Sequence, residues 1–202
     1  KDEKKIRRVK KTTINLELQK QCEEFLTSHI QKYNSFGVSN GGLLLLDWQT
    51  MEVVANVGSA NFYSDEIQGQ VNITTAKRSP GSTLKPFIYA LALEQGLIHY
   101  SSMLKDTPQA FNEYAPDNYG STFKGPVKAW YALADSRNIP AVSLAQQISN
   151  PDLYDFLKQA KISDLKNKEH YGLSIVLWSA EISIWELTKL YAMLANNGVY
   201  KN

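Results

Sequence analysis

A short helix with no polar face constrains the fold more than any other feature of the sequence. Residues 87 to 93 read Phe-Ile-Tyr-Ala-Leu-Ala-Leu, the longest uninterrupted apolar run in the 202 residues. A helix that is apolar on every side has to be covered by other elements, so we expect this one to pass through the centre of a globular domain. Because crossing a bilayer takes about 20 residues, the run predicts no transmembrane helix.

The start of the same helix carries residues that could do chemistry. Ser82 and Lys85 stand three positions apart in its first turn, so the hydroxyl and the amine can come within hydrogen-bond reach. A serine needs a base to become a nucleophile, and a lysine whose pKa is lowered by burial can serve. The exposed amides of a helix N-terminus favour negative charge that develops beside Ser82. A capping serine followed by an ordinary lysine produces the same spacing.

A second polar group, Ser136-Arg137-Asn138, lies between two predicted helices. Asp135 closes the first of these helices, and Pro140 opens the second. Such a tight loop can aim a hydroxyl, which relays a proton, and a carboxamide, which binds a peptide amide, into one cleft. A capping serine and a turn asparagine are the structural alternative. The occurrence of the polar group together with the Ser-x-x-Lys motif favours a catalytic site over this structural alternative.

The rest of the pattern predicts an α+β protein with too few strands for a full sheet. The polar, irregular stretches are expected at 58–80 and 107–125. A hairpin is expected at 43–57, with its first strand buried on both faces. Helices are expected from Asn15 to near Gly37, from Ser82 to Gly96, at 126–134 and 140–148, after the cap Asn150-Pro151, and from Ser183 to Gly198.

Charge is concentrated at the beginning of the chain. Residues 1 to 11 hold seven Lys or Arg and two Asp or Glu, whereas the other 191 residues carry a net charge of −3. This distribution predicts a basic linker or tail over 1–11, and no aromatic-rich basic patch follows it, so nucleic-acid binding is not expected. His29, His99, His170 and the single Cys22 share no metal-ligand spacing, so we expect no metal site and no cofactor.

The two motifs together resemble a known family. Ser-x-x-Lys followed by Ser-x-Asn forms the first two of the three motifs of penicillin-binding proteins and serine β-lactamases. The family's third motif, Lys-Thr-Gly or Lys-Ser-Gly, does not occur in the 202 residues. The chain is therefore similar to the N-terminal portion of a transpeptidase domain, over 12–202, truncated before the third motif. Blocks at 12–19, 78–87, 125–127, 136–142 and 181–198 resemble class A penicillin-binding proteins, closest to the penicillin-binding protein 1C branch.

The resemblance implies a partial penicillin-binding protein/serine β-lactamase-like transpeptidase fold, with a helical cluster and an incomplete antiparallel sheet. It also implies a peptidoglycan DD-transpeptidase on the outer face of the bacterial cytoplasmic membrane. In that reaction Ser82 would form an acyl-enzyme with stem peptides and would be trapped by β-lactams. Lys85 would be the base, Ser136 a proton carrier, and Asn138 would hold the substrate backbone. Membrane contact would come only from parent segments outside these residues.

Two other functions remain open. A serine β-lactamase-like hydrolase would share the first two motifs and add a deacylating group, and a non-catalytic binding or scaffold fragment is favoured by the missing third motif. The same absence leaves it open whether the truncated chain is itself an active enzyme. We also expect the two predicted strands to leave an unpaired sheet edge, through which the chain could self-associate.

Overall fold

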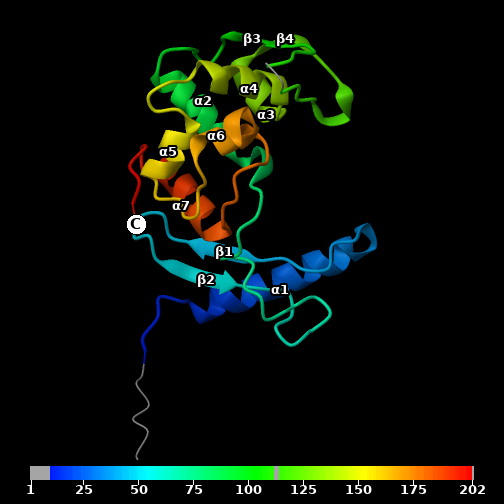
Figure 1. Cartoon of the computed structure of the whole chain (residues 1–202). Coiled ribbons are helices and arrows are strands. Elements are labelled where there is room, and N and C mark those ends of the chain that lie inside the picture. Colours follow the sequence, from blue (N-terminus) through cyan, green and yellow to red (C-terminus); the bar gives the residue numbers. More distant parts are fainter. Residues whose placement is uncertain (1–9, 112–113, 202) are drawn as a thin grey trace, which may run out of the picture. The chain divides into compact units, whose positions relative to one another are not determined.

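The structure, a computed structural model, describes residues 10–111 and 114–201 and divides into two compact units. Residues up to Ala76, together with those from Ile184 onward, form one that we call the sheet unit. Residues 77–183 form the other, which we call the helical unit. The first nine residues of the predicted basic tail at 1–11 lie outside the described residues. The mixture of helices with short antiparallel strand pairs confirms the α+β class (Figure 1).

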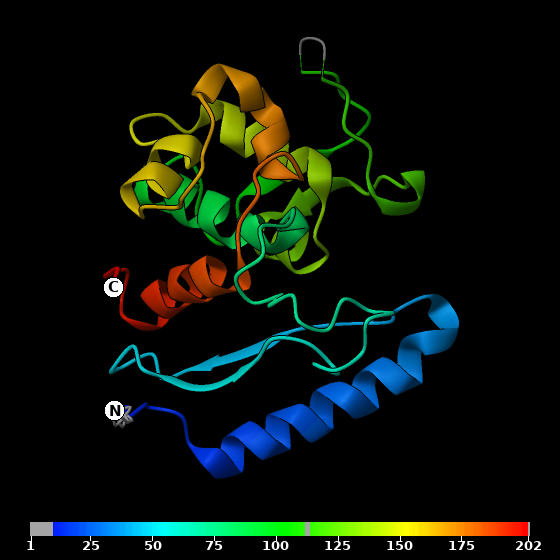
Figure 2. The same cartoon turned by 60° about the horizontal axis from the view of Figure 1, so that its bottom comes forward.

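The sheet unit is a strand pair between two helices. β1 pairs antiparallel with β2, and α1 and α7 pack on opposite sides of the pair (Figure 2). The helix expected from Asn15 to near Gly37 is present as α1, and the Asn15 side chain caps it by accepting hydrogen bonds from two first-turn amides. A 3₁₀ turn, Asn34–Phe36, follows α1 and ends at the left-handed Gly37 (φ 82°). The elements are α1 (Leu16–Tyr33), β1 (Leu43–Leu46), β2 (Val53–Val57) and α7 (Ile184–Ala195).

The prediction that the first strand is buried on both faces is wrong. None of the four residues of β1 is fully buried, and Leu45 is 38% exposed. The reason is the position of the strand, because β2 is its only partner among the described residues. The far edge of β2 is partly covered, since Asn15 N donates to Val54 O (2.9 Å) and Thr13 Oγ1 donates to Val53 O (2.6 Å).

Self-association through the uncovered edge of β1 stays a prediction. A charged side chain on an edge strand opposes pairing with another chain, so Leu45→Lys should weaken self-association about tenfold, or about 1.4 kcal/mol. The matched control is Leu97→Lys, because Leu97 is 40% exposed but lies in the helical unit. Sedimentation velocity over a concentration series measures the effect. A wild-type chain that stays monomeric throughout the series would contradict the prediction.

The helical unit is built around the apolar helix. α2 packs against α3, α4 and α5, and Phe87, Ile88 and Ala92 are at most 1% exposed. This confirms the expected central helix, although Leu93, in the last turn, is 48% exposed. Its elements are α2 (Lys85–Glu94), β3 (Met103–Asp106), β4 (Gly125–Lys128), α3 (Ala129–Ala134), α4 (Asn138–Gln147), α5 (Leu153–Gln159), α6 (Lys168–Tyr171) and 3₁₀ turns at Gly81–Leu84, Tyr119–Ser121 and Gly172–Val176.

Several helix boundaries differ from the predicted ones. The helix expected from Pro126 begins at Ala129, because Pro126 lies in β4 opposite Lys105 of β3. The helix expected from Pro140 begins two residues earlier, with α4. The cap of α5 is Asp152, whose side chain accepts from Asp155 N, rather than the predicted Asn150-Pro151 pair. The strand pair β3–β4 and the short helix α6 were not predicted.

Candidate active site

A 3₁₀ turn presents Ser82 and buries Lys85. The turn Gly81–Leu84 runs directly into α2, and Lys85 N donates to Ser82 O across it. Leu84 is 0% exposed and anchors the turn in the core, whereas Ser82 is exposed to solvent. Lys85, the residue after Leu84, is only 1% exposed. The local sequence thus puts the hydroxyl on the surface and the amine in the interior.

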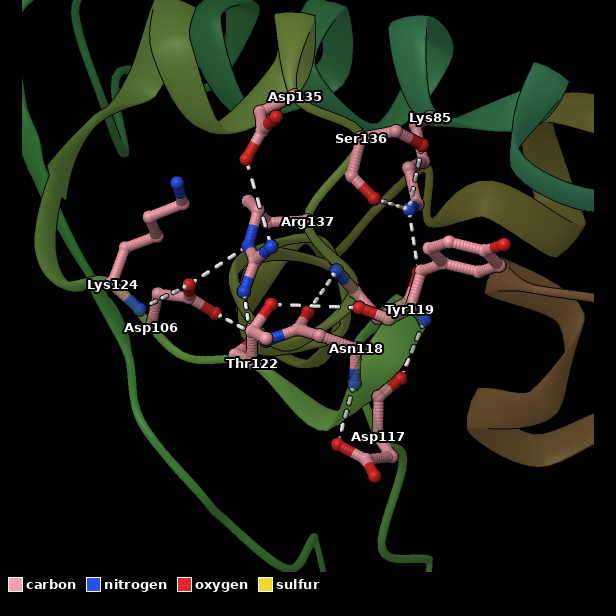
Figure 3. A network of polar contacts seen from close by, with 11 residues as sticks. Lys85, Asp106, Asp117, Asn118, Tyr119, Thr122, Lys124, Asp135, Ser136 and Arg137 are labelled. Atoms are coloured by element: carbon pink, nitrogen blue, oxygen red, sulfur yellow. Dashed lines mark hydrogen bonds and ion pairs between the residues drawn. The ribbon is translucent and has the colours of Figure 1, made fainter.

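The Lys85 amine is held by the Ser136–Asn138 turn. Its Nζ donates to Ser136 O and to Ser136 Oγ (3.1 Å), as Figure 3 shows. It also donates to Asn138 Oδ1 (2.6 Å). A buried ammonium needs a partner for each of its donors, and the turn supplies three. For this reason the amine points to the turn, and within the described chain it makes no hydrogen bond to Ser82, which the spacing of the motif had allowed.

One pocket brings Ser82 together with the second motif. It has a volume of about 520 Å³. Ser82 comes to its wall from the start of α2, and Ser136 and Asn138 come from the turn between α3 and α4. Its lining residues are Ser82, Asp117, Asn118, Tyr119, Asp135, Ser136 and Asn138. The structure therefore gathers the four residues singled out in the sequence, with Lys85 in contact with the pocket wall through Ser136 and Asn138.

Two effects lower the pKa of Lys85 to about 8. Burial is the larger, because it disfavours the charged ammonium, and the positive charge of Arg137 acts in the same direction. With a pKa near 8, about one amine in ten is neutral at pH 7, compared with fewer than about one in a thousand for an unperturbed lysine. The site thus holds an amine that can accept a proton close to neutral pH.

The end of α3 explains the position of Ser136. Arg137 N donates to Ala132 O (2.9 Å) and Ser136 N donates to Leu133 O (3.0 Å), the paired bonds of a Schellman motif. Ser136 has the left-handed conformation (φ 52°) that this motif normally gives to glycine. A residue with a side chain costs about 1–3 kcal/mol in such a conformation. In this conformation the Ser136 hydroxyl contacts the buried Lys85 amine (3.1 Å).

A buried polar network lies behind the turn and was missed by the sequence reasoning (Figure 3). Its centre is Asp106, 0% exposed, which accepts from Arg137 Nε (2.8 Å) and Asn118 Nδ2 (2.7 Å). Asp106 stands at the end of an unpredicted strand, and Asn118 lies in a stretch read only as irregular. No local pattern connects either residue to a turn about 20 to 30 positions further along the chain.

Comparison with known proteins identifies the family. The family model for the penicillin binding protein transpeptidase domain matches residues 41–202. The chain belongs to this family. Penicillin-binding protein 1C of Escherichia coli (strain K12) is 33% identical over 188 residues, 93% of this chain and 24% of that protein. Penicillin-binding protein 1A of Rickettsia bellii is 30% identical over 165 residues, 79% of this chain and 20% of that protein. The chain thus spans about a quarter of the length of such relatives.

Solved structures confirm the partial transpeptidase fold. PonA1 of Mycobacterium tuberculosis, in complex with penicillin V, superposes with a TM-score of 0.76 at 21% identity and covers 95% of this chain and 52% of that one. Penicillin-binding protein 1A of Haemophilus influenzae gives a TM-score of 0.66 at 27% identity and covers 78% and 23%. Among the described residues of this family member, no helix is long and apolar enough to cross a membrane.

Proposed function

We propose that this chain is the part of a peptidoglycan DD-transpeptidase that carries the nucleophile, Ser82. The observation that carries the proposal is the Lys85 amine, buried and held by Ser136 and Asn138 at the wall of the pocket that Ser82 lines. A solvent-exposed serine beside a lysine that can be neutral is the arrangement that acyl transfer requires. The substrates are peptidoglycan stem peptides, which places the reaction on the outer face of the cytoplasmic membrane.

The first step forms an ester. Ser82 Oγ attacks the carbonyl carbon between two D-alanines while its proton passes to neutral Lys85, and the terminal D-alanine leaves as an amine that takes a proton back. Ser136 Oγ is the favoured carrier, because it lines the pocket with Ser82 and accepts from Lys85 Nζ. In the second step, the amine of a neighbouring stem peptide attacks the ester carbonyl and forms the new amide bond. The ester C–O bond breaks, and the proton that the amine loses passes through Lys85 to Ser82 Oγ.

Asn138 is the candidate for holding the stem-peptide backbone. Its Oδ1 contacts Lys85 Nζ and its Nδ2 donates to Asp117 O (2.6 Å), so the carboxamide is fixed at the pocket wall. A β-lactam presents a strained amide to the same nucleophile and therefore acylates Ser82. PonA1, which shares the fold, has been solved with penicillin V.

Mass spectrometry of the full-length protein tests the proposal. The family's third motif does not occur in the 202 residues, so the longer protein is the form to use. Incubation with penicillin should add one penicillin mass, which peptide mapping places on Ser82, and the adduct should persist for a long time. Rapid loss of the adduct with continued turnover would identify a β-lactamase-like hydrolase instead. Absence of any adduct would identify a non-catalytic module.

A further inference from the structure

Asp106 is a fully buried carboxylate at the end of β3 that joins three segments of the helical unit. It accepts from Asn118 Nδ2 (2.7 Å) and Lys124 N (3.0 Å) in the loop that follows, and from Arg137 Nε (2.8 Å) in the turn. We propose that Asp106 is a positioning residue, which acts through Arg137 and Asn118 to hold Ser136 and Asn138 against Lys85. The inference rests on the proposed function, because that function gives the turn its role.

The first connection runs through Arg137, the middle residue of the turn. Its guanidinium is buried, donates from Nε to Asp106, and donates from a terminal nitrogen to Thr122 O. A further nitrogen lies 3.5 Å from Asp135 Oδ2. Because a guanidinium is a rigid planar fork, contacts at several of its nitrogens fix the direction of the side chain. The backbone between Ser136 and Asn138 is thereby tied to the core.

The second connection runs through Asn118. Its Nδ2 donates to Asp106 Oδ1 and to Thr122 O (3.1 Å), while its Oδ1 accepts from Asn138 N (2.8 Å). Asn138 is the first residue of α4, so its amide has no partner within the helix. Asn118 satisfies that amide and fixes the residue whose side chain holds the Lys85 amine. The two connections from Asp106, through Arg137 and through Asn118, thus lead to Ser136 and Asn138, the two residues that contact Lys85.

The network also acts on Lys85 through charge. The Arg137 guanidinium contributes to the lowered pKa of Lys85, although burial contributes more. The other charged groups of the network are Asp106 from β3, Asp117 and Lys124 from the following loop, and Asp135 from the turn. Removal of the guanidinium should therefore raise the pKa of Lys85 and move the rise of the acylation rate to higher pH.

The test uses the full-length protein and a fluorescent penicillin. Asp106→Asn leaves the buried Arg137 without its carboxylate, so this variant should lose both stability and acylation rate. The informative variant is D106N/R137M, because removing both partners leaves no unpaired buried charge and such replacements often preserve the fold. We expect a melting temperature near that of the wild type but a rate constant, per folded molecule, about 10- to 100-fold lower, because the turn is no longer positioned.

The matched control is Asp152→Asn. Asp152 caps α5 and pairs with Lys168 (2.6 Å) in the same unit, and it makes no contact with the turn. This variant should lose some stability and acylate within about twofold of the wild type. Of the two charges that D106N/R137M removes, Arg137 is the one that lowers the pKa of Lys85, so the rise of the rate with pH should shift upward in this variant and stay in place in D152N.

The outcomes separate this inference from the proposed function. A folded D106N/R137M protein that acylates at the wild-type rate, with an unchanged pH profile, would show that Asp106 only stabilises the fold and would overturn the inference alone. Wild-type protein that is not labelled at Ser82 would overturn the proposed function, and with it the assignment of Asp106. Slow labelling of the folded double variant, together with the shifted pH profile, supports the inference.

Discussion

Replacing Ser82 with alanine in the full-length protein should abolish covalent labelling by penicillin, with a rate at least about 10⁴-fold below the wild type. The reason is chemical, because alanine has no oxygen that could form the ester. The folded state should hardly change, since Ser82 is exposed and its hydroxyl makes no hydrogen bond within the described residues. Intact-mass spectrometry measures the adduct, and a thermal melt measures the stability.

Ser79 offers a matched control for this prediction. It is an exposed serine three positions before Ser82 in the same segment, and it does not line the pocket. Ser79→Ala should be labelled within about twofold of the wild type, since surface substitutions of this kind change little. Full labelling of Ser82→Ala, for example at Ser136, would transfer the role of nucleophile to another residue and would contradict the mechanism.

The parts of the fold that the sequence predicts are those in which a short pattern determines a structure. The helix expected from Asn15 is present as α1, and the apolar run that begins at Phe87 becomes the core of the helical unit. By contrast, β3 and β4 have four residues each and no clear alternation, and Pro126 in β4 is also a common first residue of a helix. Strands as short as these are determined by pairing between distant segments.

In the candidate site, too, local sequence patterns predict some features, and contacts between distant segments determine the others. The motifs locate Ser82, Lys85, Ser136 and Asn138, because their spacing to helix ends is visible in the sequence. The direction of the Lys85 amine is not visible there. Periodicity gives the face of a helix, but the three acceptors that attract this ammonium come from a turn some 50 positions later. Asp106 was missed for the same reason, because its partner in the turn, Arg137, lies about 30 residues away in the chain.

Lys85→Met should lower the acylation rate about 10³-fold, within the range expected for loss of a general base. The wild-type rate should rise with pH as Lys85 loses its proton, and it should reach half of its maximum near pH 8, where the amine is half neutral. Lys85→Arg provides the sharper variant, because it keeps the positive charge and the donors but cannot release a proton near neutral pH. If Lys85 were needed only for structure, the arginine variant should acylate faster than the methionine variant. If Lys85 is the base, both variants should lose the acylation rate equally.

Loss of the charged Lys85 amine should affect the stability of the protein differently from its acylation rate. In the folded protein the pKa of Lys85 is lowered from 10.5 to about 8, so the unfolded chain binds the proton more tightly. Keeping the buried amine charged therefore lowers the free energy of unfolding by about 3 kcal/mol below pH 8. This loss of stability disappears as the pH rises from about 8 to 10.5.

Lys85→Met removes the charge, so the variant should melt no lower than the wild type at pH 7, even though the acceptors on Ser136 and Asn138 lose a donor. Both of those residues line the pocket, where water can replace the lost donor. The matched control is Lys105→Met on the exposed face of β3, which should change neither the melting temperature nor the labelling. A Lys85→Met protein that is folded and fully labelled at pH 8 would exclude Lys85 as the base and transfer that role to another group at the pocket wall, which also holds Asp117, Asp135 and Ser136.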